Sequence, residues 1–326
     1  MAIKKLAGLM YGLATLALVL APFLGAYPVF VMKLLCFALF AAAFNLLIGF
    51  TGLLSFGHAA FFGAAAYVAG HVVKVWGLSP EIGLVLGTAV AACLGWLFGL
   101  LAIRRQGIYF SMITLALAQM VFFIALQAPF TGGEDGLQGV PRGSVMGLFD
   151  LRDDLHMYYV TLGVVVSALA LIYRTVHSPF GQVLKGIKEN EPRAVSLGYD
   201  VHRYKLLAFV LSASLAGLAG ALKTIVLGFA TLSDVHWTTS GQVILMTLVG
   251  GLGTLSGPLV GSGVVVLLEN KLGEVGSWLH AATSVEWFAK LGESVTMVTG
   301  LIFIVCVLTF RRGIMGEIIH AFTRRR

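Results

Sequence analysis

The chain has 326 residues, of which 58% are hydrophobic and only 11% charged, far below the roughly 25% charged residues of a soluble globular domain. Its formal net charge is +7. Because about 20 apolar residues cross a bilayer as a helix, the recurring apolar runs predict an all-α polytopic membrane protein with about eight to ten transmembrane helices. The runs are continuous rather than alternating, which argues against a transmembrane β-barrel.

The excess of Lys and Arg is typical of the cytoplasmic loops of membrane proteins. We therefore expect membrane lipid to surround the chain, and we expect no nucleic-acid partner. Cys36, Cys93 and Cys306 all lie in apolar runs. We interpret them as small packing residues and expect neither a disulfide nor a metal site.

The first apolar run, Leu6–Leu24, follows Lys4 and Lys5. A cleaved signal peptide has the same pattern. Here, however, the run continues almost directly through Pro28 into a second run, Val29–Phe50. We therefore predict a retained first span and a cytoplasmic amino terminus.

The second run leads into residues 51–63, where Ser55, Gly57 and His58 interrupt apolar sequence. Small residues let helices approach closely in membranes. An ionisable side chain at membrane depth is expensive and usually faces a cavity or a partner helix. Two interpretations of His58 stay open, a place on a transport pathway and a hydrogen-bonded packing role.

The next predicted spans end near Lys74, cover Ile82–Ile103, and run from Gly107 to Gln127. Arg104 and Arg105 follow the second of these and indicate its cytoplasmic end. Residues 129–157 are net acidic and are predicted to form an external loop. The glycines that follow Thr131 in this loop are not followed by the Gly-Lys-Ser/Thr sequence of a phosphate-binding loop.

A span over Tyr158–Tyr173 leads to the loop 174–205, and a span over Leu206–Gly228 leaves it. Gly217 and Gly220 are spaced for one close helix contact. Lys223 lies near the outer end, from which its stem could snorkel to the interface.

The loop 174–205 is dense in charge and mostly basic. We predict that it is cytoplasmic and that it meets a cytoplasmic partner.

Residues 241–268 contain Gly250, Gly253 and Gly257-Pro258. One uninterrupted crossing here would place the acidic segment 269–293 inside and the Arg-rich tail outside, against the charge rule. We therefore predict a discontinuous or re-entrant element that breaks at the glycines, with a break near residues 55–58 as the alternative. Residues 269–293 then form an external amphipathic segment, and a last span, Ser294–Phe310, leaves the carboxyl terminus in the cytoplasm.

Chemistry that would drive transport or catalysis is missing from the sequence. No Asp or Glu lies in the middle of a predicted span, as a proton relay would require. There is no Walker A sequence, HExxH or G-x-S-x-G motif. We predict that the chain is not an enzyme, has no catalytic residues and holds no cofactor of its own.

Several blocks together resemble the LivM-type permeases of branched-chain amino acid ABC importers, in the same order over nearly the whole chain. They are the residues 54–63, Gly107-Ile108-Tyr109-Phe110, Thr131-Gly132-Gly133, Ser178-Pro179-Phe180-Gly181, 187–191, Arg193-Ala194, Leu197-Gly198 and Gly250-Gly251-Leu252-Gly253-Thr254. The resemblance implies a single permease domain, 1–326, with a type II-like ABC importer fold in the bacterial inner membrane. It also implies a LivH-type permease as heterodimer partner, two cytoplasmic ATPase subunits that bind the ATP, and a periplasmic amino-acid-binding protein.

The resemblance further implies two sets of functional residues. Glu191, Ala194 and Gly198 match the acidic-Ala-Gly signature by which permeases dock on their ATPases. The arrangement that the resemblance implies includes a short helix in this loop, starting near Pro192. We expect the coupling residues to be Lys188, Glu191, Arg193, Ala194 and Gly198, and the translocation pathway to involve Ser55, Gly57, His58, Thr131, Gly250 and Gly253. Two alternatives stay open: a urea or short-amide importer with the same architecture, and a stand-alone channel or membrane enzyme.

Overall fold

The computed structural model describes residues 17–25, 27–145, 147, 149–283, 298, 300–301, 304–305, 308–309 and 313–317. Its helices are η1 (Ala21–Leu24), α2 (Pro28–Thr51), α3 (His58–Lys74), α4 (Pro80–Ala102), α5 (Ile108–Gln127), η2 (Pro129–Thr131), η3 (Gly133–Asp135), α6 (Asp154–His177), α7 (Pro179–Glu189), α8 (Glu191–Ser196), α9 (Val201–Leu227), α10 (Leu232–Val235), α11 (Trp237–Gly250) and α12 (Gly257–Thr283). Two short antiparallel strands, β1 (Ser144–Val145) and β2 (Phe149–Asp150), form a hairpin between α5 and α6.

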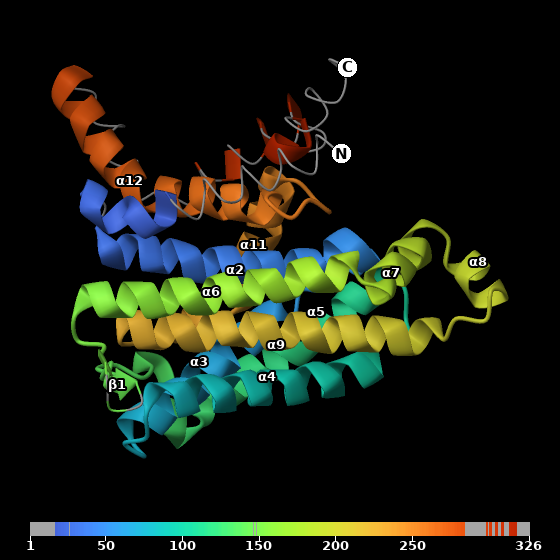
Figure 1. The fold of residues 1–326 in the computed structure, drawn as a ribbon, viewed down its shortest axis with the longest axis horizontal. Coiled ribbons are helices and arrows are strands. Elements are labelled where there is room, and N and C mark those ends of the chain that lie inside the picture. Colours follow the sequence, from blue (N-terminus) through green and yellow to red (C-terminus); the bar gives the residue numbers. More distant parts are fainter. Residues whose placement is uncertain are drawn as a thin grey trace.

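Five of the described helices, α2, α4, α5, α6 and α9, are long and apolar enough to cross a membrane. They run side by side along the long axis of the molecule (Figure 1). The predicted all-helical, multi-pass membrane architecture is therefore confirmed. The predicted spans Leu6–Leu24 and Ser294–Phe310 lie largely outside the described residues.

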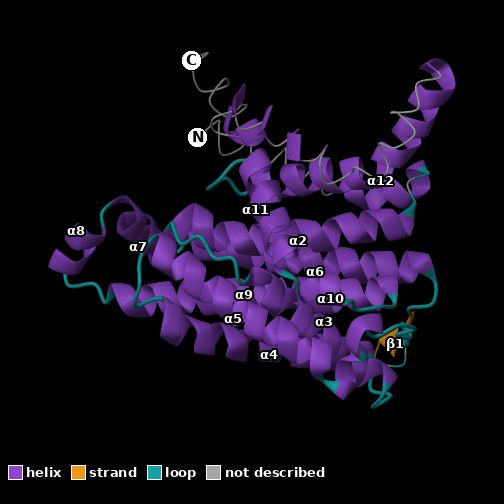
Figure 2. Cartoon of the chain, turned by 180° about the vertical axis from the view of Figure 1, so that it is seen from behind, coloured by secondary structure: helices purple, strands orange, loops and turns teal. Residues whose placement is uncertain are grey.

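The two ends of the bundle differ. Helices α7 and α8 lie at one end, where α8 projects beyond the long helices, and the β-hairpin lies at the other (Figures 1 and 2). We call these the α8 end and the hairpin end.

Helix α9 is central and packs against α2, α3 and α4. Its small residues allow this close approach: a Cβ at Gly220 would collide with the carbonyl oxygen of Phe62 in α3, and one at Gly217 with the Cβ of Ala91 in α4. In a membrane, where lipid is as apolar as the helices, such close packing is a main source of association. The predicted contact of Gly217 and Gly220 is present, and each glycine faces a different helix.

Both candidate breaks in the sequence are real. Helix α2 ends at Thr51 and α3 begins at His58, with irregular backbone between them. Helix α11 ends at Gly250, and α12 begins at Gly257 and packs back against α11. Left-handed backbone at Gly52 (φ 77°) and Gly253 (φ 72°) allows these departures from helix.

One predicted boundary is not present. Helix α12 continues from Gly257 to Thr283, so residues 269–283 extend this helix and do not begin a separate amphipathic segment. The residues 269–283 are of mixed polarity, and without the preceding helix they resemble an independent surface element. Residues 284–293 lie outside the described residues.

Candidate functional site

The loop between α6 and α9 folds into two helices because polar side chains cap each of them. The hydroxyl of Ser178 accepts a hydrogen bond from the Gly181 amide at 3.3 Å, ahead of Pro179 in the first turn of α7. The side chain of Asn190 accepts one from the Arg193 amide at 3.0 Å and begins α8. Side-chain caps of this kind replace the partners that the first amides of a helix lack. The short helix expected near Pro192 is thus present as α8.

The inner face of α8 is anchored to its neighbours. Ala194 is buried and packs with Ile187 of α7 and Val201 of α9. Glu191 forms an ion pair with Lys205, with 2.7 Å between Oε2 and Nζ. Gly198, just after α8, has left-handed backbone (φ 85°), and its amide donates to the Val195 carbonyl at 2.9 Å. Three predicted coupling residues therefore shape the helix and hold it in place.

The outer face of α8 is open and partly apolar. Val195 is 57% exposed and Leu197 68% exposed, and Arg193 is also exposed. Exposed apolar side chains beyond the membrane-spanning helices, rimmed by charge, mark a surface that a protein partner can cover.

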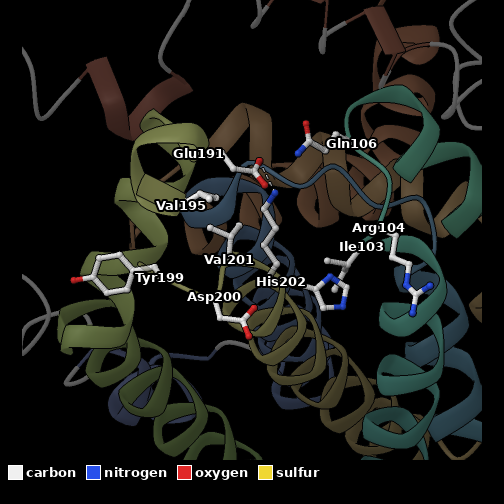
Figure 3. Close-up of a pocket in the computed structure, with 10 residues that line it drawn as sticks. Ile103, Arg104, Gln106, Glu191, Val195, Tyr199, Asp200, Val201 and His202 are labelled. Atoms are coloured by element: carbon white, nitrogen blue, oxygen red, sulfur yellow. Dashed lines mark hydrogen bonds and ion pairs between the residues drawn. The ribbon is translucent and has the colours of Figure 1, made fainter. Parts of the chain in front are cut away.

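A cavity of about 400 Å³ lies beside α8 (Figure 3). The connection between α4 and α5 lines one side of it, with Ile103, Arg104 and Gln106. Glu191, labelled in Figure 3, and its ion-pair partner Lys205 also line the cavity. Groups of both charge signs thus face one open hollow at the α8 end.

Lys188 points away from the outer face. Its ammonium donates a hydrogen bond to the Gly49 carbonyl oxygen of α2 at 2.8 Å. This predicted coupling residue therefore connects α7 to the end of a membrane-spanning helix.

Two other helices, α5 and α11, hold the break between α2 and α3. The hydroxyl of Ser111 in α5 donates to the Leu54 carbonyl at 2.6 Å, and that of Thr114 accepts from the Phe56 amide at 3.2 Å. The hydroxyl of Ser240 in α11 accepts from the Ala59 amide at 2.9 Å. Ser55 is fully buried, and its hydroxyl accepts from the Gly57 amide at 3.1 Å. The freed backbone is thus satisfied by hydroxyl side chains inside the bundle, as irregular segments at membrane depth require.

His58 is fully buried at the start of α3. Its Nε2 lies 2.9 Å from the Ser212 hydroxyl, and that hydroxyl donates its one proton to the Ala43 carbonyl at 2.6 Å. Ser212 must therefore accept from His58, which places the ring proton on Nε2. The rings of Phe44, Phe61 and Phe209 meet the imidazole edge-on. This geometry favours the hydrogen-bonded packing role for His58 over a place on an open pathway.

Gly250 ends α11, and Gly253 lies within the turn between α11 and α12. A Cβ at Gly250 would collide with the Gly257 carbonyl oxygen, so the two helices can meet only at glycine. The Gly253 amide donates to the side chain of Asn45 in α2 at 3.0 Å. Both breaks therefore lie beside the last turns of α2.

Thr131 lies elsewhere. Its hydroxyl donates to the carbonyls of Ala125 and Ala128 and caps the end of α5 toward the hairpin end. Thr114, on the same helix, touches the α2–α3 break, and the 13 residues from Thr114 to Gln127 span about 20 Å. The structure therefore separates Thr131 from the other predicted pathway residues.

Lys223 corrects a further expectation. It does not snorkel: its side chain is buried, and its ammonium lies 2.7 Å from one Asp234 oxygen and 3.0 Å from the other. The sequence reading missed Asp234 because it lies beyond the end of α9, in the short helix α10. The same reading missed Asn45, Ser212 and Ser240, whose partners are all distant in sequence. Among the described residues, no group of three His, Cys, Asp or Glu side chains is placed to hold a metal.

Residues 27–308 match the family described as "Branched-chain amino acid transport system / permease component". The chain belongs to this family. The resemblance to LivM-type permeases is thereby confirmed, and the family is one of transport permeases rather than enzymes.

Curated relatives include the high-affinity branched-chain amino acid transport system permease protein LivM of Escherichia coli strain K12. It is 29% identical over 64% of this chain and 55% of its own length, so this chain spans about half the length of that relative. The ribose import permease protein RbsC of Bacillus subtilis strain 168 is 27% identical over 76% of this chain and 73% of its own. The solved structure of PsaBC from Streptococcus pneumoniae in complex with Fab covers 85% of this chain and 89% of its own, with 17% identity and a TM-score of 0.40.

Proposed function

We propose that this chain is the LivM-type permease subunit of an ATP-driven importer for branched-chain amino acids. It pairs with a LivH-type permease to enclose the pathway, with two cytoplasmic ATPase subunits at the α8 end. A periplasmic binding protein delivers the amino acid at the hairpin end. The protein lies in the bacterial inner membrane with both termini in the cytoplasm.

The outer face of α8 carries this proposal. A capped helix projects from the bundle (Figure 1) and exposes Val195 and Leu197 beyond the ends of the membrane-spanning helices. Exposed apolar side chains are worth most to affinity when a partner buries them fully. A rigid helix can also transmit a displacement of the partner to the helix bundle, because it moves as one body.

Charge supports the orientation. The α8 end carries Arg104, Arg105, Arg174, Lys185, Lys188, Arg193, Arg203 and Lys205. The hairpin end carries mainly acidic residues, with Glu134, Asp135, Asp150, Asp153 and Asp154 in the loop from α5 to α6. Since basic loops stay in the cytoplasm, the α8 end faces the ATPases.

The composition of three long helices supports an external source of energy. No Asp or Glu lies in α2, α5 or α9, so these helices supply no carboxylate for a proton relay. ATP binding by the partners displaces α8, and α7 and α9 follow because Ala194 and Glu191 join α8 to them. The bundle then shifts between inward- and outward-facing packings.

The LivM relatives favour branched-chain amino acids as the cargo. The similarity to a ribose permease makes a sugar the competing candidate. Cells in which the gene for this chain is deleted should lose uptake of radiolabelled leucine and regain it on complementation. Parallel assays with ribose and urea separate the cargo classes. Unchanged leucine uptake in the deletion strain, with loss of ribose or urea uptake, would refute the amino acid assignment.

The docking surface has a separate test. Val195→Asp should reduce the ATPase recovered with an affinity-tagged chain by about tenfold, because a charge replaces a buried apolar contact. Val75→Asp is the matched control: Val75 is also 57% exposed but follows α3 at the hairpin end. Equal recovery with both variants would place the ATPase contact somewhere other than α8.

A further inference from the structure

The last turns of α2 are held from two sides by segments far away in the sequence. Asn45 and Gly49 lie four residues apart and therefore one above the other on the helix. Helix α7 contacts α2 at Gly49, and the turn between α11 and α12 contacts it at Asn45. Figure 1 shows α2 with α7 at its end and α11 along its side.

The contact with α7 is a bond to backbone. The Lys188 ammonium donates to the Gly49 carbonyl oxygen at 2.8 Å. This carbonyl belongs to the last turn of α2, where the carbonyls of a helix have no partner inside the helix. The stem of Lys188 passes close to Gly52, where a Cβ would lie 3.3 Å from the lysine Cγ. A movement of α7 therefore acts directly on the end of α2, at the start of the α2–α3 break.

The contact between Asn45 and the α11–α12 turn consists of two hydrogen bonds. The Asn45 Oδ1 accepts from the Gly253 amide at 3.0 Å, and its Nδ2 donates to the Thr254 carbonyl at 2.8 Å. Asn45 is only 2% exposed, and a buried amide is costly unless it is hydrogen-bonded. Two bonds to consecutive residues set both the distance and the orientation of the turn relative to α2.

The position of the turn determines where α12 begins. The Thr254 hydroxyl accepts from the Gly257 amide at 3.0 Å and donates to the Gly251 carbonyl at 2.8 Å. Gly257 is the first residue of α12. A shift of Thr254 therefore moves the start of a 27-residue helix.

We infer that Lys188 and Asn45 are positioning residues that act in series, from α7 through the end of α2 to the start of α12. They link the ATP-driven movement of the α8 end to both broken elements. This inference rests on the proposed function, because the movement that the two residues transmit is supplied by the ATPases. Bonds to backbone suit this role, since a backbone acceptor cannot swing away as a side chain can.

The test uses the complex purified with its native partners through a tag on this chain and reconstituted in vesicles. Lys188→Met removes the ammonium but keeps the stem, and Asn45→Leu removes the amide but keeps the volume. Each variant should assemble normally and hydrolyse ATP within about twofold of wild type, while leucine transport falls about tenfold, the range expected for a coupling residue. Transport per ATP is therefore the quantity that changes.

Matched controls are available on α7 itself and on α12. Lys185→Met removes the same charge from α7, where the ammonium lies over the Phe50 ring at 5.7 Å and makes no bond to backbone of α2. Asn270→Leu removes an amide that bonds only to Val266 of its own helix. Both controls should transport leucine within about twofold of wild type. Lys188→Arg keeps a donor of similar reach and should recover most of the transport.

The double variant decides between a series and two independent contacts. In a series, Lys188→Met with Asn45→Leu is no worse than the poorer single variant, whereas independent contacts multiply to a loss of about a hundredfold. A hundredfold loss, or a proportional fall of hydrolysis and transport in the singles, would overturn the inference. If Asn45→Leu does not assemble, Asn45→Gln, which lengthens but keeps the amide, takes its place in the cycle. A wild-type complex that shows no ATP-driven uptake counts against the proposed function instead, so the two failures are distinguishable.

Discussion

Lys223 and Asp234 form a buried ion pair that joins the end of α9 to the short helix α10, with the ammonium 2.7 and 3.0 Å from the two carboxylate oxygens. The ammonium also lies 4.5 Å from the centre of the Phe229 ring. Asp234 accepts from the Thr231 amide at 2.9 Å and so caps α10. The pair therefore fixes the point where the chain turns back into the bundle after α9.

Breaking this pair should destabilise the protein strongly. Lys223→Met leaves the Asp234 carboxylate buried without its cation, which costs about 3–5 kcal/mol. Adding Asp234→Leu should restore most of the loss, because an apolar pair needs no desolvation of charge. Unfolding of the detergent-solubilised protein by increasing SDS measures both variants. Lys74→Met, which removes an exposed bond to the Gln138 carbonyl, is the control, and equal stability of the single and double variants would contradict the prediction.

The contact of α9 with α3 should not tolerate even a methyl group. Gly220→Ala forces the added Cβ onto the Phe62 carbonyl oxygen, and the two helices must separate at a cost of about 1–3 kcal/mol. Gly163→Ala in α6 is the control, because nothing lies within 4 Å of its Cβ position, and it should stabilise the helix by about 0.5–1 kcal/mol. The same SDS unfolding assay compares them, and effects of equal sign would show that glycine content, not the contact, matters.

His58 should depend on Ser212. In Ser212→Ala the Nε2–H of the buried ring loses its acceptor, and an unsatisfied buried donor costs about 1–3 kcal/mol. Ser214→Ala, two residues away, removes only a bond to the Leu211 carbonyl in the same helix and should have little effect. The stability of the two variants in detergent can be compared directly. A Ser212→Ala protein as stable as wild type would mean that His58 has another partner.

The backbone after α8 should require glycine. Gly198 has φ 85° with nothing within 4 Å of its Cβ position, so Gly198→Ala meets no clash but strains the left-handed backbone by about 1–2 kcal/mol. Helix α8 should then unwind at its end, and recovery of the ATPase with the tagged chain should fall. Gly186→Ala in α7, also with open space around it, should leave recovery unchanged. Normal recovery with Gly198→Ala would show that the turn is not needed for docking.

Hydropathy alone predicted the long helices closely. The run Ile82–Ile103 corresponds to α4 at Pro80–Ala102, and Val29–Phe50 to α2 at Pro28–Thr51. The reason is physical: in lipid every backbone group must be bonded within its own helix, so apolar length and helix length coincide. The charge rule predicted the α11–α12 break, and the glycines at 250–253 indicated where it lies.

Which residues meet was decided by the tertiary structure alone. Asn45 bonds to Thr254 across 209 positions in the chain, and Lys188 to Gly49 across 139. The sequence shows that Asn45 is a polar residue in an apolar helix. The free-energy cost of burying its amide depends on a hydrogen-bond partner whose position is set by how the helices pack. Lys223 shows the same point in reverse, since its apolar surroundings suggest a snorkelling lysine until α10 folds back and brings Asp234 against it. Apolar pattern sets how deep a residue lies in the membrane, whereas packing sets its neighbours, and for this permease the neighbours connect the α8 end to the broken helices.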